Sequence, residues 1–140
     1  MLETEKAAIR RVYEEVWVKN NLQAMDEICV PNLVTHGTPE GTPTVLEGWR
    51  TYFRMIQKAF PDTKFTIEDQ IAEVDKVVTR WKTTGTQTGE FMNIPASRKK
   101  ITITGIEIDR FNNGKIVEDW NEFDQMGLMQ QIGVVPMPGD

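Results

Sequence analysis

Cysteine and histidine are nearly missing from this sequence, which contains one of each, Cys29 and His36. A single cysteine excludes an intramolecular disulfide, and one cysteine with one histidine cannot supply the ligands of a structural zinc site. We therefore expect no metal site in the chain. Cys29 lies on the apolar side of a short helical pattern, where we expect a small buried hydrophobic residue.

Signals for several common classes of protein are absent as well. No apolar run approaches the roughly 18 residues of a membrane span, and the first residues form no apolar export segment, so we expect a cytoplasmic protein without membrane contact. No glycine-rich phosphate loop or GxSxG motif occurs. The formal net charge is -5, and basic residues form no long run, so we expect no nucleic acid partner. Acid/base chemistry without a cofactor, or simple ligand binding, remains.

Three amphipathic patterns fill the N-terminal half, with apolar residues every three or four positions, as on one buried helix face. They cover residues 7–17, 22–29 and 46–60. Pro31 and Pro61 follow the second and third patterns and end them. Between them, residues 33–37 are long enough only for an edge strand, and residues 38–43 predict a loop.

After Pro61 the apolar period changes from 3.6 to 2, which is typical of strands. Four long antiparallel strands are predicted, over residues 65–71, 77–88, 101–111 and 116–124. Residues 112–114, Asn-Asn-Gly, fit a tight hairpin turn between the last two strands. A short helix over 126–132 and a loose tail over 134–140 complete the chain.

The third predicted strand changes phase along its length. Ile101 and Ile103 share one face, whereas Ile106 and Ile108 share the other. We therefore expect a β-bulge at Gly105 that bends the strand and curves the sheet.

These patterns predict one domain, residues 1–140, of the α+β class. Three N-terminal helices would pack on a curved, mainly antiparallel sheet of four long strands and a short one. Such packing leaves a cavity at the open end of the sheet, so we expect one small-molecule pocket.

Asp124 is the first candidate for chemistry in this pocket. It has the strand parity of Ile116 and Trp120, so it would face the cavity if Trp120 does. A carboxyl group on an apolar wall has a raised pKa and serves as a general acid. Alternatively, Asp124 caps the C-terminal helix.

His36 and Asp69 are further polar candidates. His36 titrates near neutral pH and would lie at the cavity mouth, although a structural role is the alternative. Asp69 has the parity of buried neighbours, and a bend in its strand would turn it outward.

Large aromatic side chains lie within or at the ends of the apolar patterns. They are candidates for a ligand-binding wall, and ordinary packing in the core is the alternative for all of them. Lining a cavity, they would suit a flat, mostly apolar ligand. The candidates are Trp17, Trp49, Phe53, Trp81, Phe91 and Trp120.

Several short segments, in this order and spacing, resemble the SnoaL-like polyketide cyclase, or ester cyclase, family. They are Tyr13–Trp17, Thr35–Gly37, Ala59–Asp62, Gly85–Phe91, Asn93–Pro95, Thr104–Ile106, Ile116–Trp120 with Asp124, Gly127–Leu128 and Gln130–Gly133. The resemblance extends from about Ala7 to Gly133.

This resemblance implies the NTF2-like cone fold, a dimer, and a cofactor-free intramolecular aldol condensation of a polyketide ester. An aspartate on the last strand acts as acid/base in the characterised cyclases, and Asp124 matches its position. Many relatives have an acid on each side of the histidine. Here Thr35 and Gly37 flank His36, which argues against a mechanism with two acids at that mouth.

Two hypotheses follow. The chain is a small cyclase, or a related lyase, isomerase or hydrolase, that works through Asp124 with help from His36. Alternatively, it is a non-catalytic domain that binds an apolar or aromatic metabolite. Strands 77–88 and 101–111 carry apolar or β-branched residues on both faces, so we also expect a homodimer through the outer face of the sheet.

Overall fold

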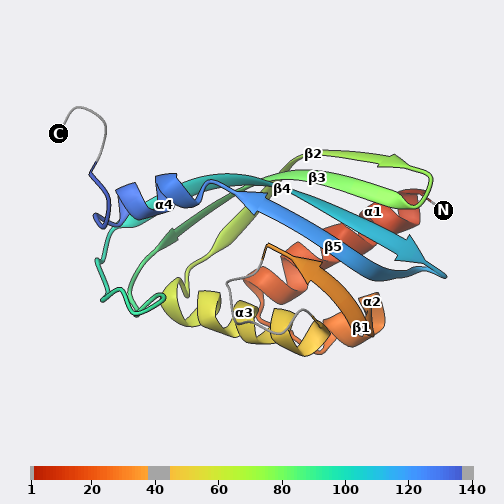
Figure 1. The fold of residues 1–140 in the computed structure, drawn as a ribbon, viewed down its shortest axis with the longest axis horizontal. Coiled ribbons are helices and arrows are strands. Elements are labelled where there is room, and N and C mark those ends of the chain that lie inside the picture. Colours follow the sequence, from red (N-terminus) through yellow and green to blue (C-terminus); the bar gives the residue numbers. More distant parts are fainter. Residues whose placement is uncertain (1, 38–44, 137–140) are drawn as a thin grey trace.

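The computed structural model describes residues 2–37 and 45–136 (Figure 1). The loop expected over 38–43 and the last four residues of the expected tail lie outside this part of the chain.

The helices gather on one side of the molecule, apart from the C-terminal one (Figure 1). They are α1 (Leu2–Arg11), the π-helix η1 (Val12–Val18), α2 (Ala24–Ile28), α3 (Leu46–Ala59) and α4 (Gln125–Gln131). η1 continues directly from α1, and the backbone N–H of Lys19 donates to the carbonyl oxygen of Glu14, five residues earlier, at 3.3 Å. Such wide turns occur frequently at functional sites.

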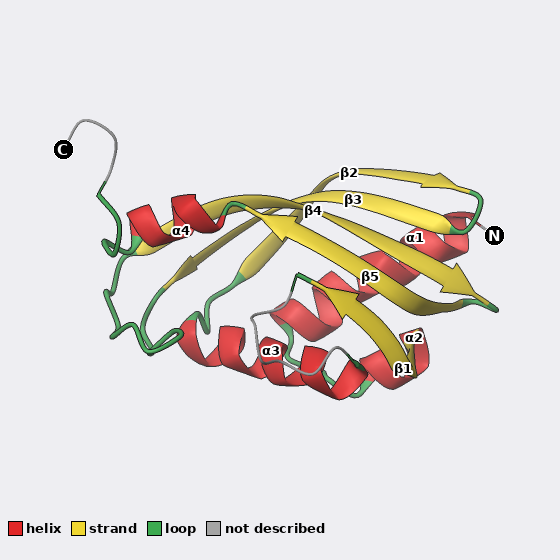
Figure 2. Cartoon of the chain, in the orientation of Figure 1, coloured by secondary structure: helices red, strands yellow, loops and turns green. Residues whose placement is uncertain are grey.

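A single five-stranded sheet forms the other layer (Figure 2). Its strands are β1 (Cys29–His36), β2 (Lys64–Glu73), β3 (Lys76–Thr86), β4 (Lys100–Asn112) and β5 (Lys115–Phe123). The spatial order is β1-β5-β4-β3-β2, with β1 parallel to β5 and the other pairs antiparallel. The sheet curves over the helices without closing, which confirms the predicted α+β cone of the NTF2-like type.

The core lies between the concave face of the sheet and the helices. Val16, Met25 and Phe53 from the helices are fully buried, as are Leu33 and Ile116 from the sheet. Burial of each such side chain contributes roughly 1.5–3 kcal/mol to stability. In the described part of the chain, no helix lies over the opposite, outer face of the sheet (Figure 2).

The predicted hairpin turn is confirmed, because Asn113 and Gly114 have φ of 51° and 79°, the left-handed values that a tight hairpin turn requires. The short strand is longer than predicted. β1 begins at Cys29, where a helix was expected, and pairs in parallel with β5.

The bulge predicted at Gly105 is wrong. β4 pairs with β3 in an unbroken register, and its residues alternate between buried and exposed from Ile101 to Phe111. Glycine is required at position 105 for another reason, because a Cβ atom there would lie 2.2 Å from Cζ2 of Trp81. The glycine therefore makes room for the indole ring of the neighbouring strand.

Irregular pairing occurs instead at two other places. In β5, Arg110 pairs with Glu118 and Phe111 with Ile116, so that Val117 is an extra residue. In β2 the register shifts between Ile67 and Asp69. A bulge of this kind bends its strand and reverses the face that later residues occupy.

No helix in the described part of the chain is both long and apolar enough to cross a membrane.

Candidate functional site

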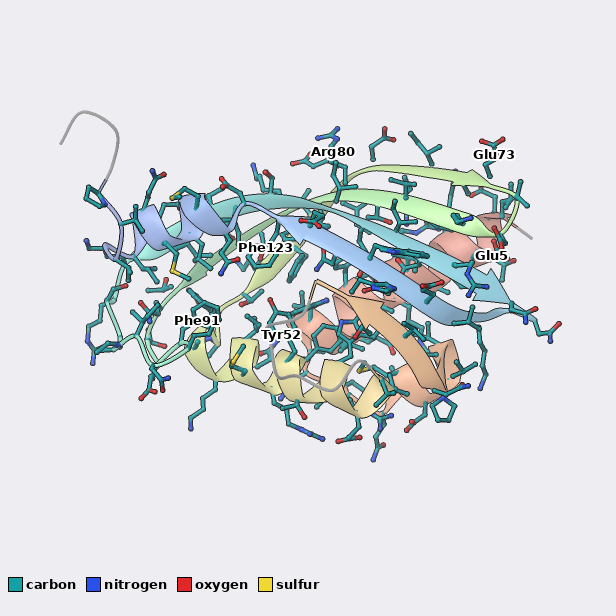
Figure 3. The ribbon with its side chains drawn as sticks, in the orientation of Figure 1. Glu5, Tyr52, Glu73, Arg80, Phe91 and Phe123 are labelled. Carbon is teal, nitrogen blue, oxygen red and sulfur yellow. The ribbon has the colours of Figure 1, made fainter. Side chains whose placement is uncertain are left out.

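A cavity of about 600 Å³, measured with its open mouth, lies between the concave face of the sheet and the helices η1 and α3. Most of its wall is aromatic or aliphatic. The aromatic part includes Trp17, Tyr52, Phe65, Trp81, Phe91 and Phe123. In Figure 3, Tyr52 on α3, Phe91 on the loop after β3 and Phe123 at the end of β5 lie around this space. The predicted pocket is therefore present, and its wall suits a largely apolar small molecule.

Glu107 is the acidic residue in this wall. Its carboxylate accepts a hydrogen bond of 2.8 Å from the phenol of Tyr13, which η1 positions. Burial raises the pKa of Glu107, and hydrogen bonds from Asp119, Tyr13 and Asp109 offset part of the rise. A carboxyl group in this setting exchanges a proton closer to neutral pH than an exposed one does.

The unbroken alternation of β4 explains why Glu107 points inward. Gly105, Glu107 and Asp109 have the same parity as the buried Ile103 and Phe111. Ile106 therefore lies on the outer face, where it is 48% exposed.

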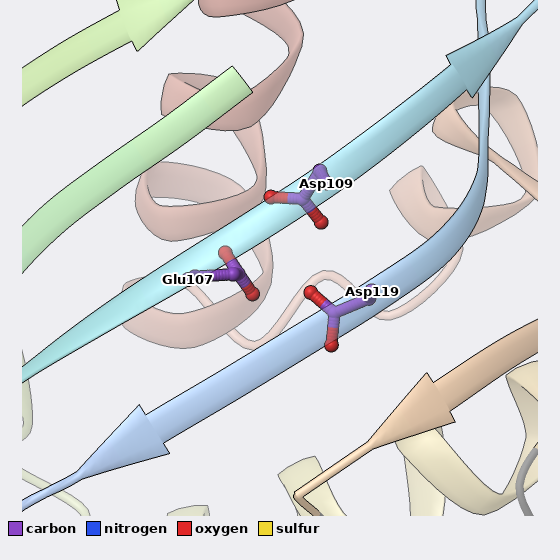
Figure 4. A group of neighbouring side chains, drawn as sticks. All are labelled: Glu107, Asp109 and Asp119. Carbon is purple, nitrogen blue, oxygen red and sulfur yellow. The ribbon is translucent and has the colours of Figure 1, made fainter. Parts of the chain in front are cut away.

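Two more acids lie next to Glu107 on the same face of the sheet, on the side away from the pocket (Figure 4). Asp109 on β4 and Asp119 on β5 are opposite each other in the strand register, and both are buried. Burial and then the charge of Glu107 raise the pKa of each well above its ordinary value. Burial followed by the charges of Glu107 and Asp109 also raises the pKa of Tyr13.

One carboxylate oxygen from each of these three acids lies within 4.8 Å of the other two. Hard cations such as Mg²⁺ and Ca²⁺ take six or more oxygen ligands. Within the described residues, this group includes no fourth acid, histidine or cysteine ligand, so the arrangement does not favour a resident cation.

Asp124 does not face the pocket, so the expected placement is wrong. The bulge at Val117 changes the phase of β5, which turns Asp119 and Asn121 inward and Trp120 outward. The strand ends at Phe123, and Asp124 is exposed. Its carboxylate accepts a 2.8 Å hydrogen bond from the backbone N–H of Gly127 at the start of α4, as in the helix-cap alternative.

His36 lies on the outer face beside Trp120. Its ring stacks on the indole at a centroid distance of 5.3 Å, and its Nε2 lies 2.8 Å from a carboxylate oxygen of Glu118. The side chain of His36 is 46% exposed. Both residues are therefore remote from the pocket wall, and Asp69 is exposed after the shift in β2.

The remaining aromatic candidates divide between the wall and the core. Trp17, Trp81 and Phe91 line the cavity. Trp49 and Phe53 are buried in the core, where the ring of Phe53 contacts Trp17 and Trp49.

The sequence interpretation missed Glu107, Asp109 and Asp119. The available signal was the even spacing from Ile101 to Phe111, which places both acids of β4 inward. We interpreted the opposite parity of Ile106 and Ile108 as a slip of phase at Gly105, and this interpretation introduced the incorrect bulge.

Comparisons with known proteins agree with this site and fold. IdmH from Streptomyces antibioticus, a proposed polyketide cyclase, is 31% identical, with a TM-score of 0.80 over 92% of this chain and 98% of its own. A proposed polyketide cyclase from Bacillus cereus is 30% identical, with a TM-score of 0.81 over 94% and 82% of the two chains. AclR from Streptomyces galilaeus, a proposed hydroxylase, is 25% identical, with a TM-score of 0.85 over 97% and 100%.

No curated protein sequence matches the chain. The sequence model of the SnoaL-like polyketide cyclases matches residues 7–132, which include all five strands of the sheet and every residue of the pocket wall. The chain therefore belongs to the SnoaL-like polyketide cyclase family.

Proposed function

We propose that this protein is an acid/base enzyme of the polyketide cyclase type, which needs no cofactor and closes a ring by intramolecular aldol condensation of a β-keto ester or a similar compound. The observation that carries the proposal is the position of Glu107. It is the acidic group of an otherwise mostly apolar and aromatic pocket wall, and Tyr13 holds it by a hydrogen bond.

The aldol reaction needs one proton to move between two atoms of the substrate. The carboxylate of Glu107 removes the hydrogen between two carbonyl groups, which is already acidic, and the resulting enolate carbon attacks a second carbonyl carbon. The new alkoxide oxygen then takes the proton back from Glu107. The carboxyl group returns to its starting state, so the cycle consumes no other reagent.

Two neutral polar groups of the wall are suited to orient the substrate. Burial raises the pKa of Tyr52 to about 12, so its hydroxyl remains a hydrogen-bond donor at neutral pH. The amide oxygen of Asn121 accepts no hydrogen bond from the described residues, and it lies in the wall opposite Glu107 in the register. A donor and an acceptor are thus available for oxygen groups on a mainly apolar ligand.

The relatives support a reaction on polyketides, since IdmH and the Bacillus cereus protein are both described as proposed polyketide cyclases. AclR is described as a proposed hydroxylase, so the same fold accommodates another reaction class. We favour the cyclase because the pocket supplies an acid/base group, which the aldol reaction requires.

The Glu107→Gln variant tests the proposal. Glutamine keeps the size of the side chain and accepts the hydrogen bond from Tyr13, but it cannot exchange a proton. We would screen β-keto esters and flat aromatic ketones for binding and turnover. Turnover should fall by roughly 100-fold or more, with little change in affinity.

Glu122→Gln is the matched control, because Glu122 is exposed on the neighbouring strand β5, and it should keep the wild-type rate. Wild-type turnover by Glu107→Gln would refute the proposed role of Glu107. Tight binding without turnover by the wild-type protein would instead support the binding-domain alternative.

We also propose a homodimer that forms through the outer face of the sheet. Ile71, Val78, Ile108 and Trp120 are successive partners in the strand register, and Ile106 lies beside this row. We name these five residues the outer apolar patch. Ile71 and Ile106 are 61% and 48% exposed, which favours burial against a second copy of the chain.

A further inference from the structure

The three buried acids form a compact group with a defined order. Asp109 and Asp119 are direct partners across β4 and β5, and Glu107 is opposite Asn121, one inward position nearer the pocket. All three carboxyl groups point toward one another in Figure 4. Only Glu107 belongs to the pocket wall.

This group has too few hydrogen-bond donors if all its members are ionised. Both oxygens of Asp109 and one oxygen of Asp119 accept no hydrogen bond from the described residues. Among residues 2–37 and 45–136, the phenol of Tyr13 is the only donor from another residue type that reaches the group, and it is bonded to Glu107. An ionised carboxylate is only an acceptor, whereas a protonated one also donates. Hydrogens on the carboxyl groups themselves would supply the missing donors.

The groups that act most strongly on Asp109 and Asp119 are not basic. Besides Glu107 and each other, they include Cys29 of β1. Arg50 of α3 and Lys115 of β5 act on Cys29, but Arg50 pairs with Asp26 and Glu47, and Lys115 donates to the backbone carbonyl oxygen of Asp26. Burial of adjacent negative charges costs several kcal/mol per ion.

We propose that Asp109 and Asp119 remain protonated and donate hydrogen bonds to Glu107, which is thereby the one carboxyl group of the three that ionises and exchanges a proton with the pocket. The two aspartates are positioning residues, since neither lines the pocket. Together with Tyr13 they stabilise a carboxylate that burial alone would keep protonated. The catalytic meaning of this arrangement rests on the proposed function, but the protonation pattern does not.

Infrared spectroscopy tests the protonation pattern directly and needs no substrate. At about pH 7, protonated carboxylic acids give a carbonyl band separate from that of carboxylates, and exposed acids with ordinary pKa values near 4 do not contribute to it. We expect this band in the wild-type protein. Asp109→Asn and Asp119→Asn should each remove about half of it, whereas Asp69→Asn, at an exposed position, should leave it unchanged. Circular dichroism would confirm that each variant is folded.

The pH profile of turnover tests the positioning role. Asp119→Asn keeps an N–H donor, so the acidic limb of the kcat/KM profile should stay at the wild-type pH. Asp119→Leu has a side chain of similar volume but no donor, so the limb should move up by about one pH unit, which is a tenfold loss of rate below it. A merely structural role would change the rate without moving the limb.

The opposite results would overturn the inference. A wild-type protein without the band, or a band that neither Asn variant reduces, would show that the aspartates are ionised. Loss of the band on addition of Mn²⁺ or Ca²⁺, together with a higher Tm, would assign the group to a cation instead. If the band behaves as expected but Glu107→Gln retains turnover, the inference stands and the proposed function fails. If the band is absent while Glu107→Gln is inactive, only the inference fails.

Discussion

We predict that this protein is less stable at pH 8 than at pH 5, because the buried acids Asp109 and Asp119 hold protons in the folded chain. Burial first, and then the charge of Glu107, raises the pKa of Asp109 and Asp119 well above normal. In the unfolded chain these groups ionise at an ordinary pKa of about 4. Above about pH 5 the folded chain therefore binds more protons than the unfolded chain, so stability declines as the pH rises.

The size of the effect follows from the number of extra protons. Each one lowers the free energy of unfolding by about 1.4 kcal/mol per pH unit. While both remain protonated in the folded chain, Asp109 and Asp119 together give about 2.7 kcal/mol per unit. Because a typical domain has only about 5–15 kcal/mol in total, the decline should be easy to measure.

Other shifted groups define the rest of the curve. Hydrogen bonds from Thr86 and from His36 lower the pKa of Asp62 and Glu118, respectively. Their stabilising contribution is lost as the pH falls through the acid range, so stability also declines on the acid side. The raised pKa of Tyr13 and of Cys29, caused first by burial, extends the decline into the alkaline range.

Urea unfolding followed by tryptophan fluorescence, at pH values from 5 to 8, would measure the slope. Asp109→Asn should reduce it by about half, since one extra proton is lost, whereas Asp69→Asn should not change it. A stability that is constant or rises over this range would refute the reasoning, because it would mean that the aspartates are ionised in the folded chain.

Two further changes test other parts of the structure. Asp124→Ala should lower the free energy of unfolding, measured in urea, by about 1 kcal/mol, because the α4 cap is lost. Asp124→Asn keeps the cap and should be nearly neutral. A large loss of turnover with normal stability in Asp124→Asn would restore Asp124 as the catalytic acid. Ile106→Lys in the outer apolar patch should shift the proposed dimer toward monomer in sedimentation experiments. Val74→Lys, at a site that is 84% exposed, should leave the dimer unchanged. A wild-type protein that is monomeric at micromolar concentration would contradict the dimer.

The order of helices and strands could be predicted because each depends on local periodicity. The three helical patterns, the change of period after Pro61 and the Asn-Asn-Gly turn all appear in the structure. The beginning of β1 could not be predicted, because Cys29 continues a helical apolar pattern and only pairing with β5 makes it a strand residue.

The site was harder to predict because strand parity needs a fixed reference point. The bulge at Val117 has no local sequence signal, and it reversed the faces of Trp120 and Asp119 relative to Ile116. In β4 the error came from interpreting the change of parity between Ile103 and Ile106 as a bulge. Ile106 is half-exposed on the outer face, and Glu107 is buried, so apolarity alone did not identify the inner side.

The extra residue in β5 changes the spacing of the inward side chains but not the side of the sheet on which they lie. Ile116 and Asp119 both face inward although they are three positions apart. Removal of Val117 would restore the regular spacing of two, so every later side chain would keep its face while the strand straightened. Asp119 and the wall residues Asn121 and Phe123 that follow it would therefore face inward in a chain of either length.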